Sequence, residues 1–332
     1  MLETLLAQGR PLLADGATGT NLFEMGLTSG DSPELWNVDH SDRIQALHRS
    51  FVDAGADIIL TNSFGGNRRR LMLHQLEGRA RELNRLAAEI ARAAAKGAGR
   101  PVVVAGSVGP TGDLLAPLGP ITSDEAFDIF VEQMEGLRDG GVDVVWIETM
   151  SSPDEIGAAA RAAGSLGMPY TITASFDTAG RTMMGVAPAA LAELSAGLDP
   201  PPLAFGANCG VGAADLVMSI LAMTQARPEA VVIAKANAGI PQWHGAHIHY
   251  SGTPELMAVY AGLAIDAGAR IVGGCCGSTP AHLSAMRRAI DGHAAGVRPQ
   301  LADVEAALGP LAAPPSAAEG QTRARRRGSA PR

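Results

Sequence analysis

Three cysteines are the residues in this 332-residue chain whose type and spacing are best suited to chemistry. Cys209 stands in the run Asn-Cys-Gly, and Cys275 and Cys276 are adjacent in the run Gly-Gly-Cys-Cys-Gly. Their number is odd and adjacent cysteines have poor geometry for a bridge, so a disulfide framework is not expected. We therefore predict reduced thiols in a cytoplasmic protein.

If the three thiols met at one point, they would suit Zn²⁺, which prefers tetrahedral coordination by soft ligands. Three protein ligands leave a fourth position free, as catalytic zinc sites do. The glycines beside the cysteines allow a tight turn that aims two consecutive side chains at one ion. The sequence thus predicts one zinc ion per chain. The plainer alternative is that the cysteines are small buried apolar side chains.

Eight short apolar runs are predicted to be strands buried on both faces, because they lack the alternation of a half-exposed strand. They cover 11–14, 56–61, 101–106, 142–148, 170–175, 203–207, 230–234 and 269–274. Helical patterns cover 41–54 (with Ser41 as cap), 75–95, 123–137, 153–163, 213–223, 253–267 and 279–290. The repeated strand–helix unit predicts a closed (β/α)8 TIM-type barrel over residues 1–312. An open doubly wound sheet is the alternative, but no G-x-G-x-x-G follows the first run.

In such a barrel the chemistry lies where strands end and loops begin. Cys209 ends the sixth predicted strand, and Cys275 and Cys276 end the eighth. Two strands that are two apart around a barrel have ends close enough to share an ion. The predicted elements therefore place the zinc site at the carboxyl-end rim of the strands.

Two carboxylates end predicted strands on the same rim. Glu148 closes the apolar run Val-Val-Trp-Ile, and Asp15 follows the first strand in a glycine-rich loop. A carboxylate at the end of a buried strand is costly unless it is paired, so Glu148 is expected to bind a substrate ammonium or an internal arginine. Backbone N–H groups of the Asp15 loop can hold a carboxylate. Together with zinc, these groups suggest an amino-acid substrate that carries a thiol.

The runs LLADGATGT, TNSFGGN, WIETM, GANCG and GGCCGSTP resemble the homocysteine S-methyltransferase family over about residues 10–292. That family includes betaine–homocysteine methyltransferases and the homocysteine-binding module of cobalamin-dependent methionine synthase. The resemblance implies a zinc-holding barrel that methylates homocysteine to methionine. It also implies that Cys209, Cys275 and Cys276 are the zinc ligands, and that Asp15, its loop and Glu148 hold the amino and carboxylate groups of homocysteine.

Three further residues at these strand ends are assigned to the homocysteine site. Gly16 follows Asp15 in the glycine-rich loop, Asn62 follows the second predicted strand, and Asn208 precedes Cys209. Their place in the sequence next to the reactive groups carries this prediction.

The methyl donor is expected to be betaine or a related onium compound, and such a cation needs an aromatic cage. Trp36, Phe64 and Trp243 are the preferred cage residues, with Phe176 and Tyr250 as further candidates. The loop that begins at Phe64 is closer to the methionine-synthase module than to the aromatic-rich loop of the betaine enzymes. A separate corrinoid protein and S-methylmethionine are the alternative donors, because the chain is too short for folate and cobalamin modules.

Charge argues against nucleic acid and anionic membranes as partners. The chain has a formal net charge of −8, and residues 1–312 carry 21 basic and 33 acidic side chains. No uncharged apolar stretch is long enough to span a bilayer, and the start of the chain does not resemble a secretory signal. The segment 313–332 holds five arginines and is predicted to be a disordered tail. An oligomer is compatible with the sequence.

Two rival functions use the same residues differently. Lys235, near the end of the seventh predicted strand, would form a Schiff base in a barrel lyase, or it is paired with a rim carboxylate. A non-catalytic zinc-binding protein would use the three thiols alone. The histidine-rich segment 243–249 matches no established zinc spacing and is expected to be a solvated or donor-facing loop.

Overall fold

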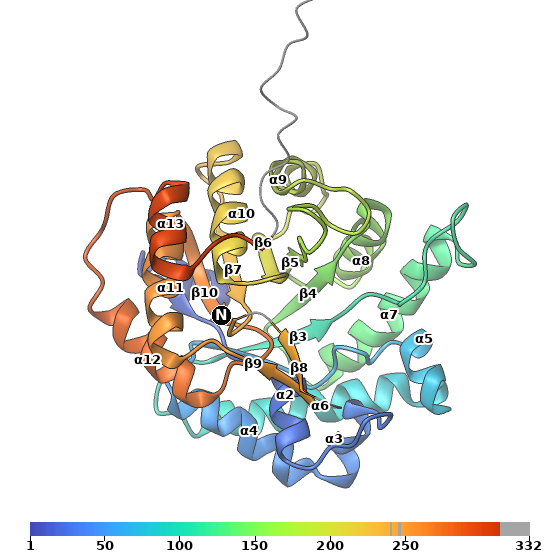
Figure 1. The fold of residues 1–332 in the computed structure, drawn as a ribbon. Helices are drawn as coiled ribbons and strands as arrows, with labels where there is room; N and C mark the ends of the chain where they lie inside the picture. Colours follow the sequence, from blue (N-terminus) through green and yellow to red (C-terminus); the bar gives the residue numbers. More distant parts are fainter. Residues whose placement is uncertain (240, 245–246, 313–332) are drawn as a thin grey trace, which may run out of the picture.

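The chain folds into a barrel of eight parallel strands surrounded by helices (Figure 1). The computed structural model describes residues 1–239, 241–244 and 247–312, with backbone alone for residues 241–244 and 247–249. The strands are β1 (Leu12–Leu13), β2 (Ile58–Leu60), β3 (Val103–Val108), β4 (Val144–Met150), β5 (Tyr170–Ala174), β6 (Ala204–Cys209), β7 (Val232–Ala236) and β10 (Ala269–Gly274). The predicted barrel is confirmed, and each predicted strand end lies within two residues of the observed one.

Every strand pair in this sheet is parallel, in the order β1-β10-β7-β6-β5-β4-β3-β2. A parallel bridge between Ala14 and Ile58 joins the two ends of that order and closes the barrel. The alternative of an open doubly wound sheet is therefore excluded. Because all strands run in the same direction, their carboxyl ends meet at one rim.

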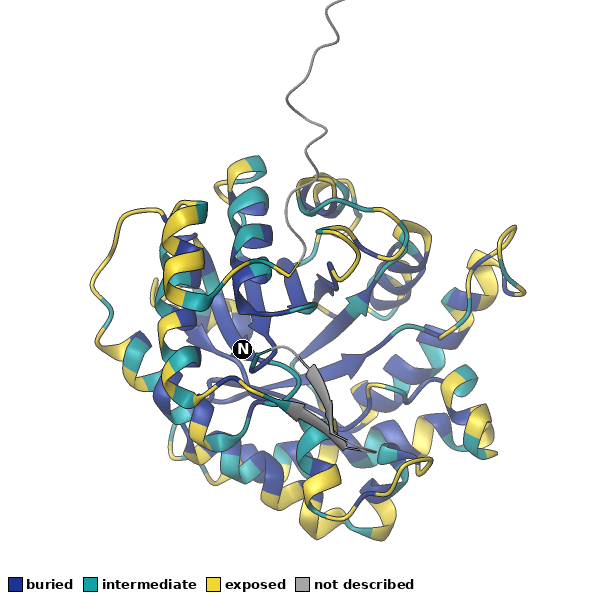
Figure 2. Cartoon of the chain, in the orientation of Figure 1, coloured by how far each residue is buried: buried dark blue, intermediate teal, exposed yellow. Residues whose placement is uncertain are grey.

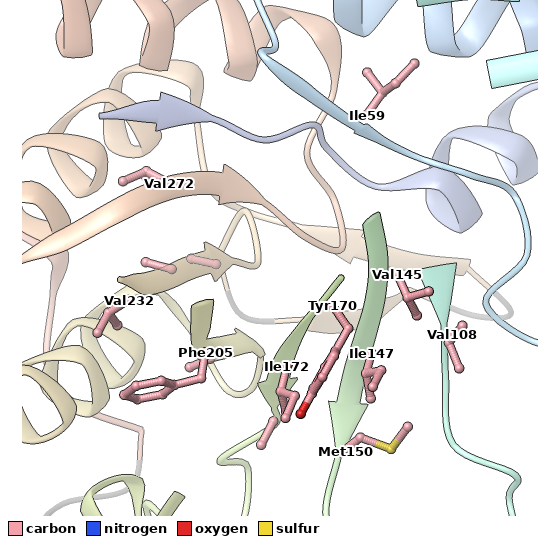
Figure 3. Packing of buried hydrophobic residues seen from close by; sticks show 14 of the residues in the cluster. Ile59, Val108, Val145, Ile147, Met150, Tyr170, Ile172, Phe205, Val232 and Val272 are labelled. Carbon is pink, nitrogen blue, oxygen red and sulfur yellow. The ribbon is translucent and has the colours of Figure 1, made fainter. Parts of the chain in front are cut away.

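Alternate residues of each strand fill two separate apolar layers. Val144 and Trp146 of β4 face the barrel interior with Ile58, Val103 and other small or branched residues. The intervening positions pack outward against the helices. Figure 3 shows two of them, Val145 and Ile147, on the same side of β4. Figure 2 shows the barrel strands buried along most of their length, whereas the helices expose one face. This double burial explains why the strands are continuously apolar in sequence.

Helices link successive strands on the outside of the barrel. The main ones are α4 (Ser41–Asp53), α6 (Ala80–Lys96), α7 (Ser123–Asp139), α8 (Pro153–Ser165), α9 (Pro188–Ala196), α10 (Ala213–Ala226), α11 (Pro254–Asp266) and α12 (Pro280–Asp291). Short helices add α1 (Leu2–Leu6), α2 (Thr18–Glu24), α3 (Trp36–Asp39), α5 (Arg68–Leu71) and α13 (Leu301–Leu308). All seven predicted helices are present, and α9 was missed because its nine residues have little amphipathic contrast.

Three local predictions were wrong. Helix α6 begins at Ala80 rather than at residue 75, because Gln75 is left-handed with φ 60° and a short 3₁₀ turn follows it. Ser41 is the first helical residue of α4, whereas the preceding His40 occupies the cap position without a capping hydrogen bond. The histidine-rich segment is not a loop, since β8 (Pro241–His244) and β9 (His247–Tyr250) form an antiparallel hairpin.

Two further predictions concern membrane-spanning segments and the C-terminal segment. Among the described residues, no helix is long and apolar enough to cross a membrane. The predicted disordered tail, residues 313–332, lies outside the described residues.

Candidate active site at the carboxyl end of the barrel

Polar side chains replace apolar ones as the strands approach the carboxyl-end rim. In β4 the interior position after Trp146 is Glu148, and in β7 the interior position after Ile233 is Lys235. In β3 the same alternation brings Ser107 inward, two residues beyond Ala105. The apolar interior thus gives way to a cluster of buried polar side chains at the rim, because side chains two apart on a strand point the same way.

The three cysteine side chains converge at this rim. Their sulfur atoms lie within 4.8 Å of one another and form the one group of metal-ligating side chains found in the described part of the chain. The sulfurs of Cys209 and Cys276 are 3.9 Å apart, and Nδ2 of Asn208 lies 3.9 Å from the sulfur of Cys275. Cys209 adopts φ 61°, a left-handed conformation that a non-glycine residue rarely takes outside a constrained site.

The spacing and chemistry of this cysteine cluster fit a zinc ion. A tetrahedral ion with Zn–S bonds of about 2.3 Å requires sulfurs about 3.8 Å apart. Without a cation, hydrogen bonds from Cys209 and Cys275 lower the pKa of the Cys276 thiol, and the partner thiols raise that of Cys209. A divalent cation would stabilise all three sulfurs as thiolates.

Asp15 and Lys235 form a buried ion pair within this polar cluster. Nζ of Lys235 lies 2.7 Å from Oδ1 of Asp15, and the N–H of Leu60 donates to Oδ2 at 2.7 Å. Burial opposes the charge on Lys235, but the attraction of Asp15 and Glu148 outweighs it and raises the pKa of this ammonium. The same ammonium lies 5.8 Å from the centre of the Trp146 ring. Pairing with a rim carboxylate, one of the two predicted states of Lys235, is confirmed.

Glu148 has no cation of its own. Its side chain is 8% exposed and accepts a hydrogen bond from the hydroxyl of Ser107. Among the described residues no lysine, arginine or histidine lies within ion-pair distance of it, so the internal arginine expected as an alternative is absent. Burial raises the pKa of Glu148 to about 7, and the nearby Lys235 only partly opposes that rise. Two carboxylates thus share one ammonium.

Asn208 ties the cysteine cluster to the next strand ends. Its Oδ1 accepts hydrogen bonds from the N–H of Thr149 at 2.9 Å and the hydroxyl of Thr173 at 2.7 Å, and its Nδ2 donates to Oγ1 of Thr149 at 2.8 Å. Thr149 itself has φ 62°, which is strained for a β-branched residue. The interaction holds the backbone beside Glu148 and Cys209 in one arrangement.

Gly16 and Asn62, which were also assigned to the homocysteine site, have different surroundings. Gly16 lies against the loop after β10, where an added Cβ would be 3.0 Å from the carbonyl oxygen of Ser278. Its lack of a side chain lets the Asp15 loop approach the loop that carries Cys275. Asn62 is buried, but its Nδ2 donates to the carbonyl of Pro33 at 2.7 Å and to Asn37. That amide group is therefore engaged in holding the segment before α3.

The aromatic candidates for the donor cage are spread over the rim. Trp36 is buried, with His40 against its ring edge and the guanidinium of Arg43 at 5.3 Å from the ring centre. Phe64 is half-exposed and packs closely on the backbone of Gly109. Trp243 lies in β8, where side chains are outside the described part of the structure.

The other two aromatic candidates also differ. Phe176 is buried. Tyr250 ends β9, and its hydroxyl lies near enough to Cys276 to lower the pKa of that thiol. Cβ of Tyr250 would also lie 2.4 Å from a Cβ added to Gly277. Tyr250 therefore covers the loop that carries the adjacent cysteines.

Several supporting residues were not assigned from the sequence. They are Ser107, Thr149 and Thr173, which are hydrogen-bond partners of Glu148 and Asn208. A signal for one of them was available: Ser107 shares the inward alternation of β3, just as Glu148 shares that of β4. The partners themselves depend on strand register.

The chain is similar to known proteins in sequence. A family model described as homocysteine S-methyltransferase matches residues 12–290. The methionine synthase of Mycobacterium tuberculosis is 31% identical over 299 residues, which are 85% of this chain and 25% of that protein. The methionine synthase of Mycobacterium leprae is 32% identical over 308 residues, or 87% and 25%. The chain therefore spans about a quarter of the length of these curated relatives.

Solved structures with the same fold include the homocysteine methyltransferase MmuM from Escherichia coli. Its oxidized form has a TM-score of 0.74 and 24% identity, and the match covers 86% of this chain and 98% of that one. Its metallated form has a TM-score of 0.73 and 24% identity, and covers 86% and 99%.

Proposed function

The chain belongs to the homocysteine S-methyltransferase family, and we propose that it transfers a methyl group from a small onium donor to the sulfur of L-homocysteine, giving methionine. The observation that carries this proposal is the deficit of positive charge beside the cysteine cluster. Asp15 and Glu148, both buried, share one ammonium, that of Lys235. An amino acid with a thiol would supply both the missing ammonium and a sulfur atom for the cysteine cluster.

Cys209, Cys275 and Cys276 would hold one zinc ion per chain. Zinc supplies Lewis acidity that lowers the pKa of a bound substrate thiol, so that a thiolate exists at neutral pH. The three thiols fit this role because their spacing suits tetrahedral coordination.

The residues of the chain bind and orient the acceptor. Glu148 and the Asp15–Lys235 pair take the ammonium group, and the backbone N–H groups of the loop at Gly16 take the carboxylate. Asn208 fixes Thr149 and lies next to the cysteine strand end, and Asn62 supports the rim from β2. These contacts restrict the orientation of the homocysteine sulfur, which reduces the entropic cost of reaching an in-line geometry.

The methyl transfer needs no separate catalytic base. The thiol proton of homocysteine passes to solvent before transfer. A new carbon–sulfur bond then forms as the bond between the methyl carbon and the onium nitrogen or sulfur breaks. The electron pair stays with that heteroatom, which leaves as a neutral amine or thioether.

The donor is the open half of the reaction. We favour betaine or a related onium compound. The sequence predicts Trp36, Phe64 and Trp243 as an aromatic cage for it, but Trp36 is buried against His40 and Arg43. S-methylmethionine and a methylated corrinoid protein are the alternatives. The corrinoid alternative is supported by the similarity to methionine synthases, of which this chain spans about a quarter.

Two functions of other classes are less well supported. A lyase that forms a Schiff base needs a lysine with a lowered pKa, whereas Asp15 and Glu148 raise that of Lys235. A lysine-dependent lyase predicts that borohydride traps substrate on Lys235. A non-catalytic zinc-binding protein would need the thiols but not the buried carboxylates near them.

The decisive experiment measures zinc content and methionine formation together. We expect about one zinc per chain in the anaerobically prepared protein, and methionine from homocysteine with at least one donor of a panel. The panel contains glycine betaine, a dimethylsulfonium compound, S-methylmethionine and a methylated corrinoid protein. The Cys276→Ser variant should lose zinc and at least about a thousandfold in kcat/KM. Full activity in a zinc-free variant would overturn the proposal.

A second measurement tests thiol activation directly. Because a free thiol has a pKa of about 8.5, formation of the thiolate on binding should release close to one proton per homocysteine at pH 7. Calorimetric titration in buffers of different ionisation enthalpy measures that number. Methionine, which has no ionisable thiol, is the control ligand. Binding of homocysteine without proton release would contradict activation of its sulfur.

A further inference from the structure

A groove runs along the rim next to the cysteine cluster, and no residue so far assigned to the homocysteine site explains it. It encloses a cavity of about 530 Å³ between the loops that follow β3, β4 and β5. We call it the acidic groove, formed by lining residues within 110–118, 149–155 and 175–184. Its volume suits a small organic ligand.

The charge of the acidic groove has one sign. Asp113, Asp154, Glu155 and Asp177 line it, and none of its lining residues is a lysine, arginine or histidine. Asp113 is paired with Arg69 at 2.7 Å, which leaves three carboxyl groups for which the described residues provide no cation. A ligand in this groove is therefore favoured when its net charge is positive.

Part of the lining of the acidic groove is apolar. Leu114, Leu118 and Met183 are among the large apolar side chains that the chain exposes, with Met183 70% exposed. An onium ion carries its positive charge inside a shell of methyl groups, so it is both cationic and apolar at its surface. Carboxylates beside thioether and leucine side chains match that combination without an aromatic residue.

The acidic groove is continuous with the candidate active site. Thr149 and Ser175 line the groove and also contact the strand that ends at Cys209. The N–H of Thr149 donates to Oδ1 of Asn208 at 2.9 Å, and the N–H of Gly210 donates to Oγ of Ser175 at 3.2 Å. A ligand at this end of the groove would lie next to a sulfur held at the cysteine cluster.

Hydrogen bonds hold both walls in place. The hydroxyl of Thr182 donates to the carbonyl of Ser151 at 2.8 Å, which fastens the loop after β5 to the loop after β4. The N–H and hydroxyl of Thr111 donate to Oε1 of Glu155 at 2.8 and 2.7 Å, which fastens the loop after β3 to α8. The groove is thus preformed, and a ligand need not order these loops.

We propose that the acidic groove binds the methyl donor and selects onium compounds whose net charge is positive at neutral pH. This inference rests on the proposed function, because it names the donor site of the same reaction. It distinguishes net-cationic sulfonium and ammonium ions from glycine betaine, whose own carboxylate cancels its charge. A methylated corrinoid protein, the alternative donor, would instead have to bind over the groove from the solvent side.

The test uses direct binding, so that it does not depend on turnover. In the protein labelled with ¹³C at its methionine methyl groups, trimethylsulfonium should shift the Met183 and Met184 signals, which Met183→Leu and Met184→Leu assign. The Asp154→Asn/Asp177→Asn variant should weaken this binding about fivefold, because it removes two partly exposed charges. Asp128→Asn/Glu193→Gln removes the same charge from exposed positions on α7 and α9 and should leave binding unchanged.

Each outcome of these measurements either supports or overturns the proposal. Weaker binding of glycine betaine than of trimethylsulfonium supports it, whereas equal binding of both overturns the charge selection. Unshifted Met183 and Met184 signals, or equal losses in both double variants, overturn the site. If the cation binds as expected but no donor yields methionine, the proposed function fails while cation binding by the groove stands. If only a methylated corrinoid protein donates, the donor assignment of the groove fails.

Discussion

The two ends of the barrel differ in the number of cationic partners that they provide for a buried carboxylate. At the amino end, Asp57 is surrounded by three guanidinium groups, with Arg10 at 2.8 Å, Arg287 at 3.0 Å and Arg100 at 3.8 Å. Its Oδ2 also accepts from the N–H of Leu13 at 2.9 Å. One carboxylate there has more cationic partners than it needs, and the surplus makes the loss of any single partner tolerable.

At the carboxyl end the balance is reversed. Asp15 and Glu148 depend on Lys235, and the structure records no second cation for either among the described residues. An uncompensated buried charge lowers stability, and a pocket that maintains such a deficit is prepared for a ligand that supplies the missing charge. The amino end is therefore built for stability and the carboxyl end for binding, a division typical of this barrel architecture.

Removing Lys235 should have the largest effect on stability. Lys235→Met leaves two buried carboxylates without a cation, and we expect the free energy of unfolding to fall by about 3–5 kcal/mol. Urea unfolding of the metal-free protein at pH 7.5 measures it. The other lysine of the chain, Lys96, is exposed at the end of α6, so Lys96→Met is a matched control that should cost less than about 0.5 kcal/mol. Similar losses in both variants would contradict the role given to Lys235.

Neutralising Glu148 should raise stability while it lowers affinity. The pKa of Glu148 is about 7 in the folded protein and near 4.5 when unfolded. The free energy of unfolding that is linked to this group is therefore fully present below pH 4.5 and is lost as the pH rises through 7. Glu148→Gln removes this dependence and should stabilise the metal-free protein at pH 8 by up to about 3 kcal/mol, with little change at pH 4.5.

Thermal unfolding at both pH values checks the prediction for Glu148, and calorimetry should show weaker homocysteine binding. Glu135→Gln, at an exposed ion pair on α7, is a suitable control. A variant that is less stable than the native chain at pH 8 would show that the Glu148 carboxylate is compensated after all.

The sequence predicts the carboxyl end well because strand ends are visible in it. Continuous apolar runs located all eight strands, and the barrel then placed Cys209, Cys275 and Cys276 on one rim without knowledge of their contacts. The Asp15–Lys235 pair joins positions 220 residues apart, so it depends on closure of the barrel. Sequence reasoning offered that pairing only as one of two states of Lys235.

Partners that depend on register could not be predicted. Thr149 and Asn208 are within hydrogen-bond distance because the registers of β4, β5 and β6 bring them to the same level of the barrel. A shift of the register by one residue would turn the Asn208 side chain to the other face of the sheet. The hairpin of β8 and β9 was expected to be a loop, because a histidine-rich segment has no apolar pattern that indicates strands. The surplus of arginines around Asp57 was also missed, since Arg10, Arg100 and Arg287 come from distant parts of the chain.

Removing one arginine from the amino end should have the smallest effect. Arg10 is 42% exposed on its side chain, and Arg100 and Arg287 remain beside Asp57 when it is lost. Arg10→Ala should therefore lower the free energy of unfolding by less than about 1 kcal/mol, as expected for a solvent-screened pair. The same urea titration measures it, with Arg49→Ala on α4 as a control for loss of an exposed ion pair. A loss as large as that of Lys235→Met would mean that the partners of Asp57 are not redundant, and the contrast between the two ends would fail.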